Sequence, residues 1–464
     1  MKADIAVIGG GPGGYVAAIR AASQGAKVML AEKAQLGGVC LNRGCIPTKT
    51  LLKSAEQWRF LQQCSRFGLK AEATGFDYQA ILARRDEVVS QMRKGIGQLL
   101  KSHAIEVVSG TARLTAANRL CIRSGDGEQD WTADRIILAT GSTPAPLPVP
   151  GGDLAAVLNS DHLLALPAVP ESLAVIGGGA VGIEFAAIFQ AFGCRVSVIE
   201  MQPSILPTAD SEMVRRLTPL LRKQGVSLIT GSRVTAITPA DGGVRVSLAG
   251  GGSDSSIVVE KVLAAAGRMP LLANLGLEAA GVAFSSRGIC VNERQETSVA
   301  GIYAIGDVTG RYMWAHAASA AGIAAADNAC GKPAAVDYQA VPGCVYTTPE
   351  LAMTGLTEQA AAAQGKAVKI SKFNLAANGK AVSMGEPEGL VKIIADQASG
   401  AVLGMHVLGA HASDLIMEGV LAIQHRLTAK DLAKAIHPHP SLAEAVMECA
   451  HGIDGGGIHQ LRLH

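Results

Sequence analysis

IAVIGGGPGGYVAAIRAASQGAKVMLAE (residues 5–32) aligns without a gap with LAVIGGGAVGIEFAAIFQAFGCRVSVIE (residues 173–200). Each segment begins with four apolar residues typical of a buried strand, and the pattern G-x-G-x-x-G follows directly. An apolar-periodic stretch typical of a helix comes next, and a second strand then ends in a glutamate. This order predicts a βαβ unit of the kind that binds a dinucleotide, present twice in the chain.

The glycines of this motif have separate tasks. The first permits a tight turn, the second lets the backbone approach a pyrophosphate, and the third lets the helix pack closely on the strand. The helix N-terminus then offers free N–H groups to phosphates, and the final carboxylate can accept hydrogen bonds from ribose hydroxyls. Glycine-rich turns without a ligand are the alternative interpretation. The predicted ligand residues are Gly9, Gly11, Gly14 and Glu32 in the first unit and Gly177, Gly179, Gly182 and Glu200 in the second.

The two units are predicted to bind different dinucleotides. Glu200 is followed by Met201 and Gln202, which offer no cation to a 2′-phosphate, so the second unit should prefer NAD over NADP. A third segment, TSVAGIYAIGDV, ends an apolar strand at Asp307, and a carboxylate at that edge of an open α/β sheet faces bound ligands. We therefore assign FAD to the first unit, although an ordinary turn aspartate explains Asp307 alone equally well.

Two further strand-then-glycine segments, RIILATGSTP and VLAAAGRMP, predict chain crossings between domains, and they add Gly141 to the FAD site and Gly267 to the NAD site. The predicted division is an FAD-binding domain over 1–145, an NAD-binding domain over 146–265, a return to the first domain over 266–335, and a C-terminal interface domain over 336–464. In that last unit, apolar strands precede helical segments. The expected fold class is α/β, with two Rossmann-like dinucleotide-binding domains and a C-terminal α+β domain.

Composition restricts the range of partners. Hydrophobic residues make up 48% of the chain, charged residues 17%, and the formal net charge is +2. This balance is typical of a globular protein and favours neither nucleic acid nor an acidic membrane surface as a partner. No apolar run approaches the ~18 residues of a membrane span, and a strand predicted from Ala3 leaves no room for a leader. The expected location is therefore the cytoplasm, or an organelle entered after a leader has been lost.

The segment GGVCLNRGCIPTKTLL places Cys40 and Cys45 five residues apart. On a regular helix they would be separated by about 7.5 Å along the axis, more than the roughly 4.4–6.8 Å between Cα atoms that a disulfide spans. Gly44 allows the loop to fold back, and Pro47 fits the first turn of a following helix. The spacing is compatible with a strained, redox-active bridge at a helix N-terminus. Ordinary buried thiols remain an alternative.

A zinc site is the other alternative for the two cysteines. It needs further ligands, and the only close histidine is His103, so no metal is predicted.

The C-terminal segment AIHPHPSLAEAV contains His437, His439 and Glu444. A carboxylate five residues after an imidazole can orient it and raise its basicity, as in catalytic triads. A helix is expected to begin at Pro440 or Ser441. A structural His-Pro turn is the alternative interpretation.

Taken together, GGVCLNRGCIPTK, the paired G-x-G-x-x-G units, TSVAGIYAIGD and HPHPSLAEAV resemble the pyridine nucleotide–disulfide oxidoreductase family over essentially the whole chain. The resemblance implies a flavin-dependent enzyme with a redox-active Cys40–Cys45 disulfide, and a homodimer formed through the C-terminal domain. Cys40 would exchange with the substrate and Cys45 would lie against the flavin. Lys49 would lie near the flavin N5 and pair with Glu184.

The same resemblance implies the remaining roles. Asp307 would hold the flavin ribityl chain, and a helix beginning near Ala315 would direct its N-terminus at the flavin. His439 would be the acid/base for the opposite subunit's cysteines, with Glu444 as its partner and His437 along the thiol channel. Arg43 departs from the small apolar residue common at its position, which makes it a candidate for tuning access to the cysteines.

The implied reaction is the oxidation of a dihydrolipoyl group, carried by a separate E2 or other carrier protein, to the lipoyl disulfide with reduction of NAD⁺ to NADH. The complex served would be of the 2-oxo acid, acetoin or glycine-cleavage type. Glu200 disfavours a glutathione-reducing member that uses NADPH. The ending HQLRLH, without paired cysteines, disfavours a mercury-reducing member. A flavin-loaded scaffold subunit remains an alternative from another class.

Overall fold

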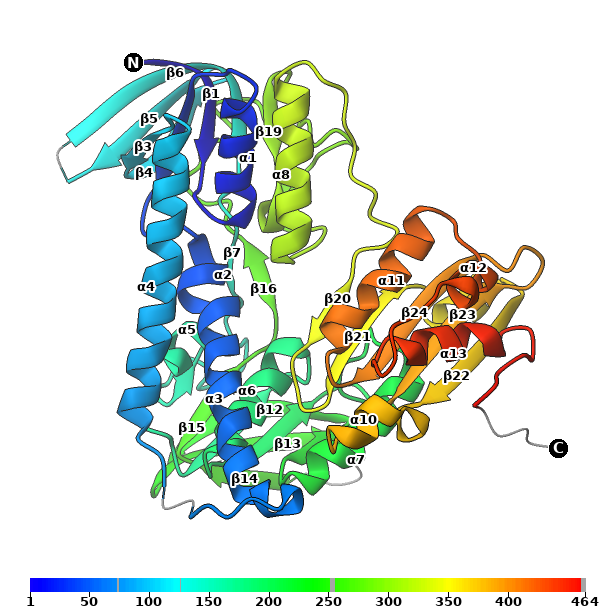
Figure 1. Cartoon of the computed structure of the whole chain (residues 1–464). Helices are drawn as coiled ribbons and strands as arrows, with labels where there is room; N and C mark the ends of the chain where they lie inside the picture. Colours follow the sequence, from blue (N-terminus) through cyan, green and yellow to red (C-terminus); the bar gives the residue numbers. More distant parts are fainter. Residues whose placement is uncertain (73–74, 126, 251–254, 460–464) are drawn as a thin grey trace.

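A twisted sheet and the helices around it form the first unit of the computed structural model, which describes residues 1–72, 75–125, 127–250 and 255–459 (Figure 1). The strand order is β3-β2-β1-β6-β5-β4, with β19 beside β6, and β2, β1, β6 and β19 run parallel. The strands are β1 (Lys2–Ile8), β2 (Val28–Glu32), β3 (Glu106–Ser109), β4 (Thr111–Ala116), β5 (Arg119–Ser124), β6 (Gly127–Leu138) and β19 (Ile302–Ala304). Helix α1 (Pro12–Ala22) packs against α8 (Ala315–Ala329), although the two are far apart in sequence.

The second unit repeats this arrangement. Its five-stranded parallel sheet has the order β11-β10-β9-β15-β8. The strands are β8 (Val157–Leu158), β9 (Ser172–Ile176), β10 (Arg195–Glu200), β11 (Ser227–Thr230) and β15 (Lys261–Ala264), with helices α5 (Ser160–Leu164), α6 (Ala180–Ala191) and α7 (Ser211–Lys223). An antiparallel sheet of β12 (Ser232–Ala240), β13 (Gly243–Gly250) and β14 (Ser255–Val259) packs beside it.

Steric constraints explain why both copies of the motif need glycine at the same places. Gly9 has φ +107°, and an added Cβ would lie 2.3 Å from the carbonyl oxygen of Ala139. Gly177 has φ +112°, with the equivalent distance 2.4 Å to Ala265 O. Both turns therefore exclude any side chain, and the strand–turn–helix units predicted from the sequence are present.

The two predicted chain crossings lie side by side. Strand β7 (Ser142–Pro144) pairs antiparallel with β16 (Arg268–Pro270), so the exit from the first unit is beside the return to it. After the return, the chain forms the short hairpin β17 (Phe284–Ser285) and β18 (Gly288–Ile289) before β19. The domain boundaries drawn from the sequence at residues 145, 265 and 335 stay predictions.

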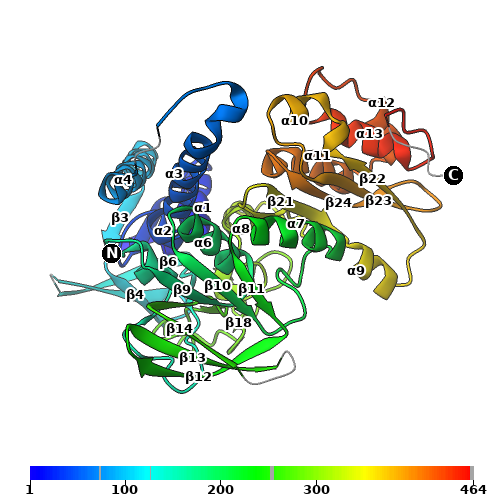
Figure 2. The ribbon, with the colours of Figure 1, turned by 90° about the horizontal axis from the view of Figure 1, so that it is seen from below.

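The C-terminal unit is an antiparallel sheet covered by helices, which Figure 2 shows beside the other two units. The strand order is β20-β21-β24-β23-β22, and α11 packs on β21 and β24 while α13 packs on β22 and β23. The strands are β20 (Gly343–Val345), β21 (Glu350–Gly355), β22 (Val368–Asn374), β23 (Leu390–Asp396) and β24 (Val402–Gly409). The helices are α9 (Glu358–Ala363), α10 (Gly379–Ser383), α11 (Ala412–Gln424), α12 (Ala429–Lys434) and α13 (Glu444–Gly452). The predicted fold class is confirmed.

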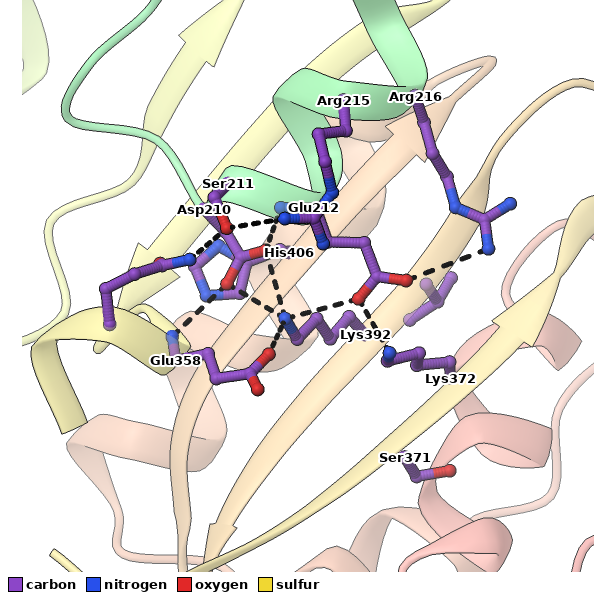
Figure 3. A network of polar contacts seen from close by, with 12 residues as sticks. Asp210, Ser211, Glu212, Arg215, Arg216, Glu358, Ser371, Lys372, Lys392 and His406 are labelled. Atoms are coloured by element: carbon purple, nitrogen blue, oxygen red, sulfur yellow. Dashed lines mark hydrogen bonds and ion pairs between the residues drawn. The ribbon is translucent and has the colours of Figure 1, made fainter. Parts of the chain in front are cut away.

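A buried ionic network joins the C-terminal unit to the second unit (Figure 3). Lys392 on β23 is fully buried, and its Nζ lies 3.0 Å from both carboxylate oxygens of Asp210, which is also fully buried. The same Nζ contacts Glu358 Oε2 at 2.5 Å and Glu212 Oε2 at 3.4 Å. Asp210 also accepts hydrogen bonds from the backbone N–H groups of Glu212 and Glu358, which lie in the first turns of α7 and α9. One lysine therefore connects three elements from two units.

None of the helices within the described ranges combines the length and the apolar character needed to cross a bilayer.

Candidate active site

The two cysteines belong to consecutive helices that a single glycine separates. Helix α2 (Gly38–Arg43) contains Cys40, and α3 (Cys45–Gln63) begins with Cys45. Gly44 between them has φ −145° and ψ −114°, which ends α2, and Pro47 lies in the first turn of α3. A Cβ on Gly44 would approach the carbonyl oxygen of Val39 to 3.0 Å. The break brings the two thiols close enough for each to shift the pKa of the other.

The environment makes Cys45 the thiolate of the pair. The hydrogen bond from Cys40 lowers the pKa of Cys45 to about 7; burial opposes this shift, and the positive charge of Lys49 supports it. The same hydrogen bond, with burial, raises the pKa of Cys40. The first turn of α3 adds the partial positive charge of a helix N-terminus.

Lys49 and Glu184 come from different units and meet beside the thiols. Lys49, one helical turn after Cys45, places its Nζ 2.8 Å from Glu184 Oε2 on α6. The Glu184 side chain is 8% exposed. The backbone N–H of Tyr346 from the C-terminal unit donates to the other oxygen of Glu184 at 3.0 Å. All three units therefore meet at this ion pair, and Tyr346 is a site residue that the sequence analysis missed.

A cavity of about 800 Å³ extends from the first glycine-rich turn to the thiols. This volume is in the range of about 300–1,000 Å³ that small-molecule sites have. The predicted residues that line it are Gly9, Gly11, Glu32, Cys40, Cys45, Lys49, Gly141, Glu184, Asp307 and Ala315. Gly14 is absent from this set because it packs against the turn, where an added Cβ would lie 1.8 Å from Gly9 O. A Cβ added to Gly11 would have no neighbouring atom closer than 3.9 Å. The space beside Gly11 is therefore open to a pyrophosphate. The cavity fits FAD.

A second group of polar side chains orients Asp307, and it also escaped the sequence analysis. The Ser142 hydroxyl donates to Asp307 Oδ2 at 2.5 Å, and Arg268 Nε donates to Ser142 Oγ at 2.8 Å. Ser142 and Arg268 lie on the paired strands β7 and β16. The only signal in the sequence was that each follows the glycine of a predicted crossing segment.

The glutamates that end β2 and β10 bind the backbone of their own motifs. Glu32 accepts hydrogen bonds from the N–H groups of Gly10 and Ala34, both at 2.7 Å. Glu200 accepts equivalent bonds from Gly178 at 2.7 Å and Gln202 at 2.8 Å. Each carboxylate therefore fixes its glycine-rich turn and retains lone pairs for a ribose.

The second motif reaches the cavity only at the start of its helix. At the start of α6, the residues that line the cavity are Ala180 and Val181. The cavity lining does not include Gly177, Gly179, Gly182, Glu200 or Gly267. Gly182 packs on the turn, with an added Cβ 2.0 Å from Gly177 O, and Gly179 is open, with no atom within 4 Å of such a Cβ. The residues fit a second dinucleotide outside the cavity.

Replacing Gly179 by alanine should weaken NADH binding at least about tenfold, or about 1.4 kcal/mol, because the methyl group occupies the approach of the pyrophosphate. The fold should tolerate the change, since Gly179 has an extended backbone and open surroundings. Titration calorimetry with NADH measures the effect. Gly97→Ala in α4 (Tyr78–Ser102), an equally open glycine that belongs to neither motif, should leave the affinity unchanged. Equal affinities in the two variants would place the pyrophosphate elsewhere.

The histidine and glutamate of the C-terminal segment are hydrogen-bonded. His439 Nδ1 lies 2.9 Å from Glu444 Oε1, and the Ser441 N–H donates to Glu444 Oε2 at 2.8 Å. These bonds outweigh the effect of burial and lower the pKa of Glu444, so the partner of the imidazole is a carboxylate. The expectation that a helix begins at Pro440 or Ser441 was wrong: α13 begins at Glu444, because the carbonyls of Leu442 and Ala443 accept from N–H groups only three residues on, in turns tighter than an α-helix.

His439 and the thiols are not brought together within one chain. The His439 side chain is 81% exposed and is not among the residues that line the cavity. His437 does not line it either: its Nε2 lies 3.1 Å from Glu418 Oε2 and its Nδ1 lies 2.9 Å from Ala435 O. Arg43 lines the cavity and pairs with Asp161 at 3.3 Å.

Residues 3–322 match the family model described as pyridine nucleotide-disulphide oxidoreductase, and residues 341–450 match the dimerisation domain of the same family. The chain therefore belongs to the pyridine nucleotide-disulphide oxidoreductase family. This membership implies FAD and NAD(H) as cofactors, and the second match supports a homodimer.

Similar proteins include several dihydrolipoyl dehydrogenases. The chain is 44% identical to a dihydrolipoyl dehydrogenase of Thermus scotoductus, over 99% of each protein. It is 39% identical to that of Bacillus subtilis, over 98% of this chain and 99% of the relative. Among solved structures, LpdA of Mycobacterium tuberculosis superposes with a TM-score of 0.90 at 28% identity, covering 97% of this chain and 99% of that one. The HOCl-induced flavoprotein disulfide reductase RclA of Escherichia coli gives 0.86 at 29% identity, with the same coverage.

Proposed function

We propose that the chain is a dihydrolipoyl dehydrogenase that oxidises a dihydrolipoyl group on a separate E2 or carrier protein and reduces NAD⁺ to NADH. The observation that carries this proposal is the thiol pair with a low-pKa Cys45, beside the Lys49–Glu184 ion pair in a cavity that fits FAD. The relatives named dihydrolipoyl dehydrogenase, alike over nearly their whole length, support this substrate. The cytoplasmic location and the four domain ranges expected from the sequence belong to the same proposal.

The thiol chemistry begins with the Cys40–Cys45 pair as a disulfide. A substrate thiolate attacks Cys40 Sγ, and the Cys45 sulfur leaves as the thiolate that its surroundings stabilise. The second substrate thiol then attacks the mixed disulfide, which closes the lipoyl ring and releases Cys40. The substrate has lost two electrons and two protons, and the cysteine pair has gained the two electrons.

A bound FAD would supply the two-electron chemistry that links the thiol pair to NAD⁺. The chain supplies the surroundings: the first glycine-rich turn and the N-terminus of α1 would hold the pyrophosphate, and Asp307, which accepts a hydrogen bond from Ser142, would hold the ribityl chain. The N-terminus of α8, which begins at Ala315 on the cavity wall, directs its partial positive charge into the same space.

His439 is the proposed acid/base that removes the substrate's thiol proton, with Glu444 holding its Nδ1. Because His439 is exposed and away from the thiols of its own chain, we propose that it acts on those of the second copy in the homodimer. Each active site would then contain residues from both subunits.

Anaerobic addition of dihydrolipoamide to the purified protein tests the proposal. We expect a long-wavelength thiolate–flavin band, followed by stoichiometric NADH when NAD⁺ is added. NADP⁺ in place of NAD⁺ is the control and should give little reduced coenzyme, since Glu200 disfavours a 2′-phosphate. A yellow protein that NADH reduces but dihydrolipoamide does not would retain the family and exclude this substrate.

A further inference from the structure

The Lys49–Glu184 ion pair is held from a third side by the C-terminal unit. Tyr346 directly follows β20, and its backbone N–H donates to Glu184 Oε1 at 3.0 Å. Its ring faces the ammonium of Lys49, whose Nζ lies 4.3 Å from the ring centroid. The ammonium is therefore placed between a carboxylate oxygen at 2.8 Å and an aromatic face. These three residues and Cys45 line the same cavity.

The ring face, rather than the hydroxyl, provides the attraction. Burial raises the pKa of the Tyr346 phenol to about 12, so the side chain is neutral at physiological pH. A neutral aromatic ring attracts a cation through the negative charge on its face, by about 0.5–2 kcal/mol depending on exposure. The Lys49 side chain is 33% exposed, between a surface and a buried cation.

Lys49 needs such a contact because its four-carbon side chain is flexible. Its charge helps to keep Cys45 ionised, and that of Glu184 opposes this effect. If the ammonium moved a short way from Cys45, the negative charge of Glu184 would raise the pKa of Cys45 with less opposition from Lys49.

We propose that Tyr346 is a positioning residue that holds the Lys49 ammonium against Glu184 beside Cys45, so that docking of the C-terminal unit fixes the charge at the thiol pair. The catalytic role of the Cys45 thiolate rests on the proposed function, whereas the effect of Tyr346 on the Cys45 thiol does not. Tyr346 acts through Lys49 and exchanges no electrons or protons itself.

The test follows the pH dependence of Cys45 alkylation by iodoacetamide in the reduced holoprotein, quantified by peptide mass spectrometry. A Cys40→Ser background leaves Cys45 as the only thiol of the pair and retains a hydroxyl donor beside it. In this background Tyr346→Leu, which keeps the backbone N–H but removes the aromatic face, should raise the alkylation midpoint by about half to one pH unit. Tyr346→Phe keeps the ring and should leave the midpoint unchanged.

Two further variants test whether Tyr346 acts on Cys45 through Lys49 and through the face of its ring. In a Lys49→Met background, Tyr346→Leu should produce no additional shift, because the group on which Tyr346 acts is absent. Pentafluorophenylalanine at position 346 keeps the ring shape but removes its negative face, so it should shift the midpoint as leucine does even if the leucine variant folds poorly.

Two results would overturn the proposal. One is an unchanged midpoint in both the leucine and the fluorinated variants, and the other is a leucine shift that persists without Lys49. The readout needs neither dihydrolipoamide nor NAD⁺, so it is interpretable even if the substrate assignment fails.

Discussion

Replacing Cys45 by serine should abolish dihydrolipoamide-dependent NADH formation while the protein remains yellow. The expected loss in turnover is on the order of 10³-fold or more, as when one member of a catalytic group that acts as a unit is removed. A serine oxygen cannot form the bond to Cys40 through which the substrate's electrons enter. The Gly9 turn and Asp307, which are proposed to hold the flavin, lie on other elements, so flavin binding should persist. Stopped-flow absorbance with dihydrolipoamide and NAD⁺ measures the rate.

Cys290→Ser is the matched control, since it removes a thiol that is exposed and does not line the cavity. It should retain full turnover. Normal turnover in Cys45→Ser would mean that electrons reach NAD⁺ without the thiol pair, and the proposed route would be abandoned.

Replacing Lys392 by alanine should destabilise the protein by about 3–5 kcal/mol, because it leaves buried carboxylates without their cation. Asp210 is fully buried, and Glu212 and Glu358 also depend on this ammonium. Burial alone would raise the pKa of Asp210, but the bonds to Lys392 help to lower it. In turn, the carboxylates raise the pKa of Lys392, although burial opposes this shift as well. Thermal unfolding of the holoprotein, followed by calorimetry at one scan rate, measures the loss.

The pKa shifts of Asp210 and Lys392 predict how the stability contributed by the network changes with pH. The contribution of Asp210, whose pKa is lowered on folding, is complete above the ordinary aspartate range and is lost as the pH falls through the lowered pKa. That of Lys392, whose pKa is raised, is complete below the ordinary lysine range and is lost as the pH rises through the raised pKa. The difference between wild type and Lys392→Ala should therefore be largest between these limits and shrink in acid.

Lys372→Ala is the matched control from the same network. Lys372 Nζ lies 2.8 Å from Glu212 Oε2, but its side chain is 44% exposed, so its loss should cost less than about 1 kcal/mol. If Lys392→Ala were no more damaging than Lys372→Ala, the buried network would not stabilise the contact between the units.

Sequence reasoning succeeded where the determinants lie within a few residues of one another. The turns at Gly9 and Gly177, the break at Gly44 and the His439–Glu444 hydrogen bond each depend on a short segment. The repeated motif also specified strand order, because a βαβ unit places its two strands side by side.

The contacts that join the units could not be predicted in this way. The only local sign of the buried network was Lys392, a charged residue within the apolar strand GLVKIIAD, and nothing in that strand identifies Asp210 as its partner. Tyr346 likewise resembles an ordinary strand-end aromatic until the sheet is docked on α6. These pairings depend on how separate cores pack against each other, and one sequence contains no distance between them.

The antiparallel pairing of β7 with β16 has an evolutionary consequence. Because Ser142 is opposite Pro270, the segment between these strands forms a cassette whose two ends are adjacent in the host fold. Recombination at these two points could exchange the coenzyme-binding unit while leaving the first glycine-rich turn and the thiol pair in the host chain. A successful graft would need acidic residues that replace Glu184 and Asp210, since these contact the C-terminal unit. Coenzyme preference can then evolve as a trait separate from thiol chemistry.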